Sequence, residues 1–124
     1  MITNEIIFDI LSRHNQNGGS TTLLPAGEDL SGLDLYAVSF CKTLEWKSNI
    51  APSPQDIAQY LTRLPAYSSG SSKAIYALGT WQDGGFHYLD MVVCLPNRED
   101  AINLGRGADQ IAICYLKDCS IILI

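Results

Sequence analysis

The sequence predicts an α+β fold, in which a mostly antiparallel sheet of about five strands packs against three short helices. Three observations predict it. Two apolar runs, at 74–81 and 86–95, flank a tight turn that contains Asp83 and Gly84; other segments carry apolar residues at helical spacing; and short turns join neighbouring strands. The chain has 124 residues, of which 47% are hydrophobic and 17% charged. This composition suits one domain over 1–124 and excludes a disordered chain.

The first predicted helix runs from residue 3 to about residue 15. Thr3 or Asn4 can cap its start, and the glycines that follow Asn17 end it, because glycine readily takes the left-handed conformation beyond a helix. Four apolar residues form one stripe along it: Ile6, Ile7, Ile10 and Leu11. A short strand at 21–24 and a polar loop at 26–32 are expected next.

The following strand, 33–40, has apolar side chains on both faces, which indicates that both faces are covered. The same alternation continues weakly to Trp46, so 42–50 is either a second strand or an irregular arm. A helix from 54 to 64 comes next. Ser53 caps it, Pro54 suits its first position, and Asp56 completes a capping box.

Beyond the hairpin, Asn97 caps a third helix, which ends at Gly105 or Gly107, and strands at 110–116 and 120–124 follow. The last strand ends in a wholly apolar run: Ile121, Ile122, Leu123 and Ile124. Such a run at an exposed sheet edge is an aggregation hazard. We therefore expect this strand to be central in the sheet, or its edge to be covered by a second copy of the chain in a homodimer.

Composition and charge argue against several functions. The net charge is −5 and the lysines and arginines lie singly, so we expect no nucleic-acid partner. No apolar run approaches the ~20 residues that span a bilayer, and no export pattern opens the chain, so we expect a cytoplasmic protein with no membrane partner. The four cysteines form no Cys-x-x-Cys pair: Cys41, Cys94, Cys114 and Cys119. They are expected to be reduced thiols, with no metal site and no cofactor.

The sequence contains no convergent catalytic set, and no catalytic residue is assigned. The candidate ligand-binding residues surround the predicted hairpin: Trp81, His87, Tyr88 and Asp90. Asp90 is the most informative, because a carboxylate within an apolar run is out of place unless it is paired or faces a cleft. His87 lies three residues away, and positions three apart in a strand point to opposite faces.

Two further features bear on this candidate cleft. A serine-rich loop at 67–73 would be its lid. If Asp90 is instead buried against Arg63, Arg98 or Lys117 with no adjoining cavity, its role is structural.

Several segments taken together resemble small, uncharacterised proteins carried by phages, plasmids and other mobile elements. The resemblance spans roughly residues 35–117 and rests on these stretches: Leu35–Ser39, Pro54–Ile57, Gly79–Gly85, Tyr88–Asp90, Glu99–Ile102 with Leu104 and Gly105, and Gln110–Ile113 with Leu116. The resemblance implies a compact α+β accessory protein of a mobile genetic element. No activity or site residue comes with it.

These observations favour a small cytosolic accessory protein that is non-catalytic, acts through protein contacts and is a homodimer, with another protein as a further possible partner. Two alternatives remain open. One is an enzyme or small-ligand binder with its cleft near the 81–90 hairpin. The other is an acidic immunity or inhibitor protein, since residues 1–62 carry most of the negative charge and would cap a basic site on a partner.

Overall fold

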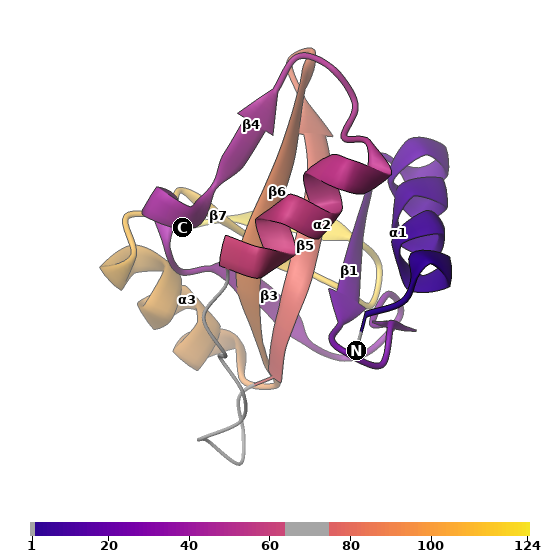
Figure 1. The fold of residues 1–124 in the computed structure, drawn as a ribbon. Helices are drawn as coiled ribbons and strands as arrows, with labels where there is room; N and C mark the ends of the chain where they lie inside the picture. Colours follow the sequence, from indigo (N-terminus) through magenta and orange to yellow (C-terminus); the bar gives the residue numbers. More distant parts are fainter. Residues whose placement is uncertain (1, 64–74) are drawn as a thin grey trace.

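A computed structural model of the protein describes residues 2–63 and 75–124. It confirms the α+β class (Figure 1). The elements in chain order are α1 (Asn4–Asn17), β1 (Gly19–Leu23), β2 (Glu28–Asp29), β3 (Tyr36–Ser39), a 3-10 turn η1 (Lys42–Leu44), β4 (Trp46–Ser48), α2 (Pro54–Arg63), β5 (Ile75–Asp83), β6 (Phe86–Leu95), α3 (Arg98–Gly107), β7 (Ala112–Tyr115) and β8 (Ser120–Leu123). None of these helices is long and apolar enough to cross a membrane.

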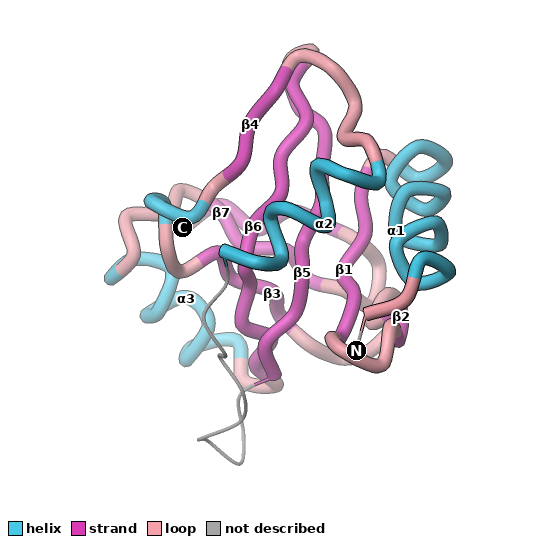
Figure 2. The backbone as a smooth tube through the Cα atoms, in the orientation of Figure 1, coloured by secondary structure: helices cyan, strands magenta, loops and turns pink. Residues whose placement is uncertain are grey.

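The strands form one antiparallel sheet in the order β2-β1-β5-β6-β3-β7-β8, and β4 pairs with β6 beside β3. The sheet curls, so that β7 crosses behind the long β5–β6 hairpin (Figure 2). Eight strands occur within the described residues, which corrects the predicted number of about five. Six of the eight fall on the six strand segments predicted above, and the two additional strands are short: β2 inside the predicted polar loop, and β4 inside the undecided segment 42–50.

The separation of β3 from β4 has a simple cause in the register. Both pair with β6: β3 with residues 92–95, and β4 with residues 87–89. Residues 40–45 thus lie opposite only Asp90 and Met91, so this segment must leave the sheet before the chain rejoins it. The segment 42–50 is therefore part turn and part strand.

One face of the sheet is covered by the helices. Figure 1 shows α2 in front of β5 and β6, and α1 alongside β1. Their core is fully buried around Ile10, Ile57, Tyr60, Leu78 and Leu89. The third helix packs on the same face of β6 further along, where Ala101 and Gly105 meet Val38, Val93 and Ile113.

The other face is covered mainly at one end. Leu30 and Leu116, from the segments after β2 and β7, pack there on Ala37, Ala77 and Cys94. The end of this face that lies toward the hairpin turn carries the aromatic residues considered below.

The predicted helix caps and turn are confirmed. Oγ of Ser53 accepts from the Asp56 N–H at 3.1 Å, while Oδ2 of Asp56 accepts from the Ser53 N–H at 2.9 Å. Gly84 and Gly85 have φ of 59° and 84°, the backbone that a two-residue hairpin turn needs. The caps at Thr3 and Asn97 also form. Leu64, Pro65, Ala74 and the expected lid at 67–73 lie outside the described residues.

Candidate functional site

The β5–β6 hairpin carries three of the four predicted ligand-binding residues on one face. Trp81 and Tyr88 lie opposite each other in the two strands, with their ring centroids 4.7 Å apart. The indole Nε1 of Trp81 donates a 3.0 Å hydrogen bond to Oδ2 of Asp90. Strand alternation places His87 on the other face, as its spacing from Asp90 predicted. The four predicted residues therefore belong to two different sites, one with Trp81, Tyr88 and Asp90 and the other with His87.

The aromatic side chains extend to the tip of the hairpin. Phe86 and Trp81 are 40% and 41% exposed. Lys47, opposite Tyr88 in β4, places its Nζ 4.4 Å from the Phe86 ring centroid and 5.6 Å from that of Tyr88. An ammonium is attracted to an aromatic face, so Lys47 joins Phe86 to Tyr88, and the ring contact with Tyr88 adds Trp81. We call Lys47, Trp81, Phe86 and Tyr88 the aromatic cluster.

Asp90 lies beside this cluster and is only 2% exposed. Burial first, and then the charge of Glu45, raise the pKa of Asp90 from 3.8 to about 6, while the Trp81 N–H and the Ser39 hydroxyl oppose the rise. Among the described residues, Oδ1 of Asp90 has no hydrogen-bond partner. The carboxyl thus has one satisfied oxygen and one unsatisfied oxygen, which favours its protonated form.

No cation neutralises Asp90 in the described parts of the chain. The ion pair found there joins Arg13 and Asp29, 3.7 Å apart, and Arg63 lies against the Tyr60 ring instead. The pairing with Arg63, Arg98 or Lys117 that would have marked Asp90 as an ion-pair partner therefore does not form. The polar groups that contact this carboxyl are the Trp81 N–H and the Ser39 hydroxyl.

His87 belongs to a different cluster on the helix-covered face. Its Nδ1 lies 2.9 Å from Nε2 of His14, and Nδ1 of His14 lies 2.9 Å from Oγ1 of Thr80. The Thr80 hydroxyl in turn lies 2.8 Å from Oγ of Ser20. These four residues form one hydrogen-bonded chain from the core to the half-buried His87, and we call it the histidine chain.

The sequence singled out His87 but not His14, Ser20 or Thr80, and of these three the most informative is His14. It is 0% exposed, and its burial, with the nearby His87 second, lowers its pKa. One signal could have found it. His14 follows Ile7, Ile10 and Leu11 at helical spacing, on the face of α1 that enters the core. A polar residue at such a position needs buried partners, and β1 and β5 supply them through Ser20 and Thr80.

The predicted interface strand lies at an edge of the sheet. β8 ends the strand order, so the expectation of a central strand is wrong. Ile121 is 62% exposed and Leu123 is 80% exposed, while Ile122 and Ile124 turn partly into the core beneath α3. The alternation of the strand therefore divides the apolar run between the core and the solvent. The other end of the sheet differs, because its short edge strand β2 is Glu28 and Asp29.

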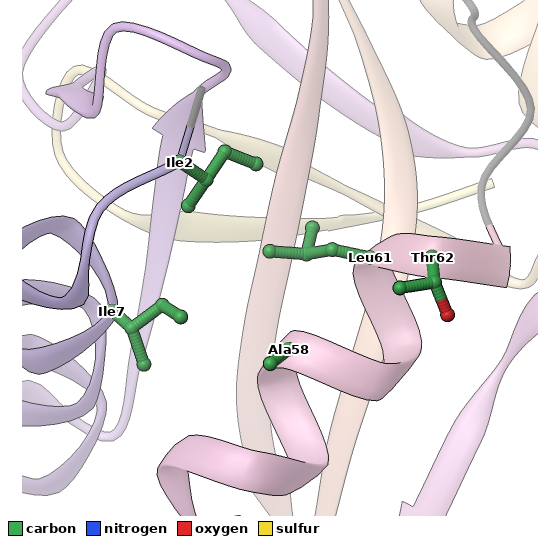
Figure 3. A pocket seen from close by; sticks show the side chains of 5 residues that line it. All are labelled: Ile2, Ile7, Ala58, Leu61 and Thr62. Atoms are coloured by element: carbon green, nitrogen blue, oxygen red, sulfur yellow. The ribbon is translucent and has the colours of Figure 1, made fainter.

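Two shallow grooves lie away from all of these residues. One, of about 240 Å³, lies between α1 and α2, where Ile2 and Ile7 face Ala58, Leu61 and Thr62 (Figure 3). The other, of about 310 Å³, lies along α3 beside Glu99, Ile102, Asn103 and Arg106. Neither groove is lined by Asp90 or by the histidine chain.

Two of the four cysteine thiols are shielded from solvent strongly enough to raise their pKa. Burial raises the pKa of Cys94 to about 12 and that of Cys114 to about 11, which keeps both thiols protonated at neutral pH. All four cysteines are free. Within residues 2–63 and 75–124, no group of three or more His, Cys, Asp or Glu side chains is placed to hold a metal ion.

Comparison with known proteins gives no match: no family model, no curated protein and no solved structure is similar to this chain.

Proposed function

We propose that this protein is a non-catalytic accessory protein that acts through protein contacts and assembles as a homodimer through the free edge of β8. The observation that carries the proposal is the exposure of Ile121 and Leu123 on the terminal strand of the sheet. Monomeric proteins protect such edges with charges, prolines or covering segments. The residues of β8, Ser120–Leu123, include no charge and no proline.

The cellular setting belongs to the same proposal. Four free cysteines suit a reducing compartment, so we propose that the protein is cytoplasmic. The resemblance over residues 35–117 supports a role as an accessory protein of a mobile genetic element. Location of the gene within phage or plasmid segments in several genomes is the expected observation. Consistent location among conserved chromosomal genes would overturn this part.

The test of the proposal is the mass of the purified full chain in solution. Light scattering coupled to size-exclusion chromatography is expected to give twice the chain mass of 13.6 kDa at high protein concentration. Leu123→Lys should shift the protein to the monomer mass, because a lysine on an edge strand opposes strand addition. Ile50→Lys is the matched control, since Ile50 is 71% exposed but lies before α2, outside the β8 edge.

Three outcomes would contradict the proposal. The wild-type chain could remain a monomer at every concentration, Leu123→Lys could remain a dimer, or Ile50→Lys could dissociate the dimer as effectively as Leu123→Lys. Circular dichroism of each variant establishes that the chain is folded before its mass is compared.

A further inference from the structure

The backbone of β8 offers two residues for pairing at its free edge. The Ile124 N–H donates to the Ile111 carbonyl at 2.9 Å, so Ile124 turns its hydrogen-bonding groups toward β7. In an antiparallel pair these groups alternate in direction along the strand. Ile122 and Ser120 therefore also turn theirs toward β7, whereas the N–H and C=O groups of Ile121 and Leu123 point away from the sheet.

A two-fold axis can pair this edge with itself in three ways, centred on Ile121, Ile122 or Leu123. Centring on Ile121 would use Cys119 to extend the ladder, but Cys119 has a φ of 57°, which is not an extended conformation. Centring on Leu123 would use only one outward-facing residue of β8, Leu123 itself, because the strand runs from Ser120 to Leu123. Centring on Ile122 places Ile121 of each copy opposite Leu123 of the other copy. Each of these two pairs can exchange two backbone hydrogen bonds, so this register allows four.

The side chains favour the same register. Ile121 and Leu123 share one face of β8 and are the two exposed apolar residues of the strand. In the Ile122-centred register each becomes the cross-strand neighbour of the other residue in the second copy, and apolar cross-strand pairs stabilise a sheet. A second copy thus supplies both the hydrogen bonds and the apolar side chains that this edge lacks, which makes it the occupant that fits.

We propose that two copies of the chain pair antiparallel through β8, with the two-fold axis at Ile122 and with Ile121 opposite Leu123 of the second copy. This inference rests on the proposed homodimer and specifies its geometry. The two sheets would then form one continuous sheet across the axis.

Disulfide trapping tests the register. The starting chain carries Cys41→Ser, Cys114→Ala and Cys119→Asn, the last because asparagine tolerates a positive φ. Ile122→Cys in this chain would face its own copy in a non-hydrogen-bonded pair with Cα atoms roughly 4.5 Å apart, within the range for a disulfide. Mild oxidation is expected to convert most of it to a covalent dimer. Ile121→Cys alone is expected to remain mostly uncrosslinked.

A second measurement avoids the partly buried position 122. Chains with Ile121→Cys and chains with Leu123→Cys are mixed and oxidised, and mixed disulfides are expected to exceed either self-disulfide severalfold. If light scattering shows a dimer but Ile121→Cys crosslinks to itself, or if no β8 cysteine crosslinks, the register is wrong while the proposed homodimer stands. If the wild-type chain is a monomer at every concentration, the proposed homodimer itself fails.

Discussion

Replacing Asp90 with asparagine should change how the stability of the protein depends on pH. The pKa of Asp90 is raised from 3.8 to about 6 in the folded chain, chiefly by burial. The fold therefore binds this proton more tightly than the unfolded chain does. Its stabilising effect is fully present below pH 3.8 and is lost as the pH rises through 6. At about 1.4 kcal/mol per pKa unit, the ionised carboxyl lowers the free energy of unfolding by roughly 3 kcal/mol at pH 8.

Asparagine keeps an oxygen that can accept from Trp81 but has no ionisation in this range. The difference in unfolding free energy, Asp90→Asn minus wild type, should therefore grow by about 2 kcal/mol between pH 4 and pH 8, because the unfolded carboxyl is already partly ionised at pH 4. Urea denaturation at pH steps across this range measures it. Trp81→Phe removes the N–H that stabilises the carboxylate, so it should destabilise the fold more at pH 8 than at pH 4. A difference for Asp90→Asn that stays flat, or that shrinks as the pH rises, would refute the reasoning.

Three further predictions concern local structure. Ser53→Ala removes the acceptor for the Asp56 N–H and should lower the free energy of unfolding by about 1 kcal/mol in chemical denaturation. An unchanged free energy of unfolding would mean that this hydrogen bond does not stabilise the helix. Gly19→Ala would place a Cβ 2.6 Å from the Thr80 carbonyl oxygen and should lower the free energy of unfolding by ~1–3 kcal/mol. Gly107→Ala is the control, because there is open space around Gly107 and no such loss is expected. Equal losses in the two variants would contradict the close approach of β1 to β5 at Gly19. Nitrogen-15 NMR of the His14 ring should show the neutral form at pH 6.5, because burial lowers its pKa; a half-protonated ring there would oppose the burial argument.

Local signals in the sequence were sufficient for most element boundaries. Ser53 with Asp56, and Asn97 with Asp100, form the caps expected of their spacing. Gly84 and Gly85 turn the hairpin as the Asp-Gly pattern predicts. These features depend on residues close in sequence, whose hydrogen bonds and backbone angles are the same whichever fold surrounds them.

The candidate sites needed more than local signals. His14 and His87 are separated by 73 positions, and their contact exists only because α1 packs on β1, which pairs with β5 of the hairpin. The presence of β2 and β4 also depends on distant partners, since each is too short to carry a periodic pattern of its own. The histidine chain is therefore a product of strand order and helix packing.

The sequence by itself determined the α+β class, the three helices and their caps, and the central hairpin. It also determined that the final strand is apolar and has side chains to be covered. Tertiary structure alone decided where that strand lies. Pairing with β7 makes β8 an edge, with Ile122 toward the core and Leu123 toward solvent. It also decided that Asp90 is buried beside Trp81, with no cation paired to it among residues 2–63 and 75–124. Composition and periodicity state how much apolar surface must be covered, whereas the long-range register decides which residues cover it.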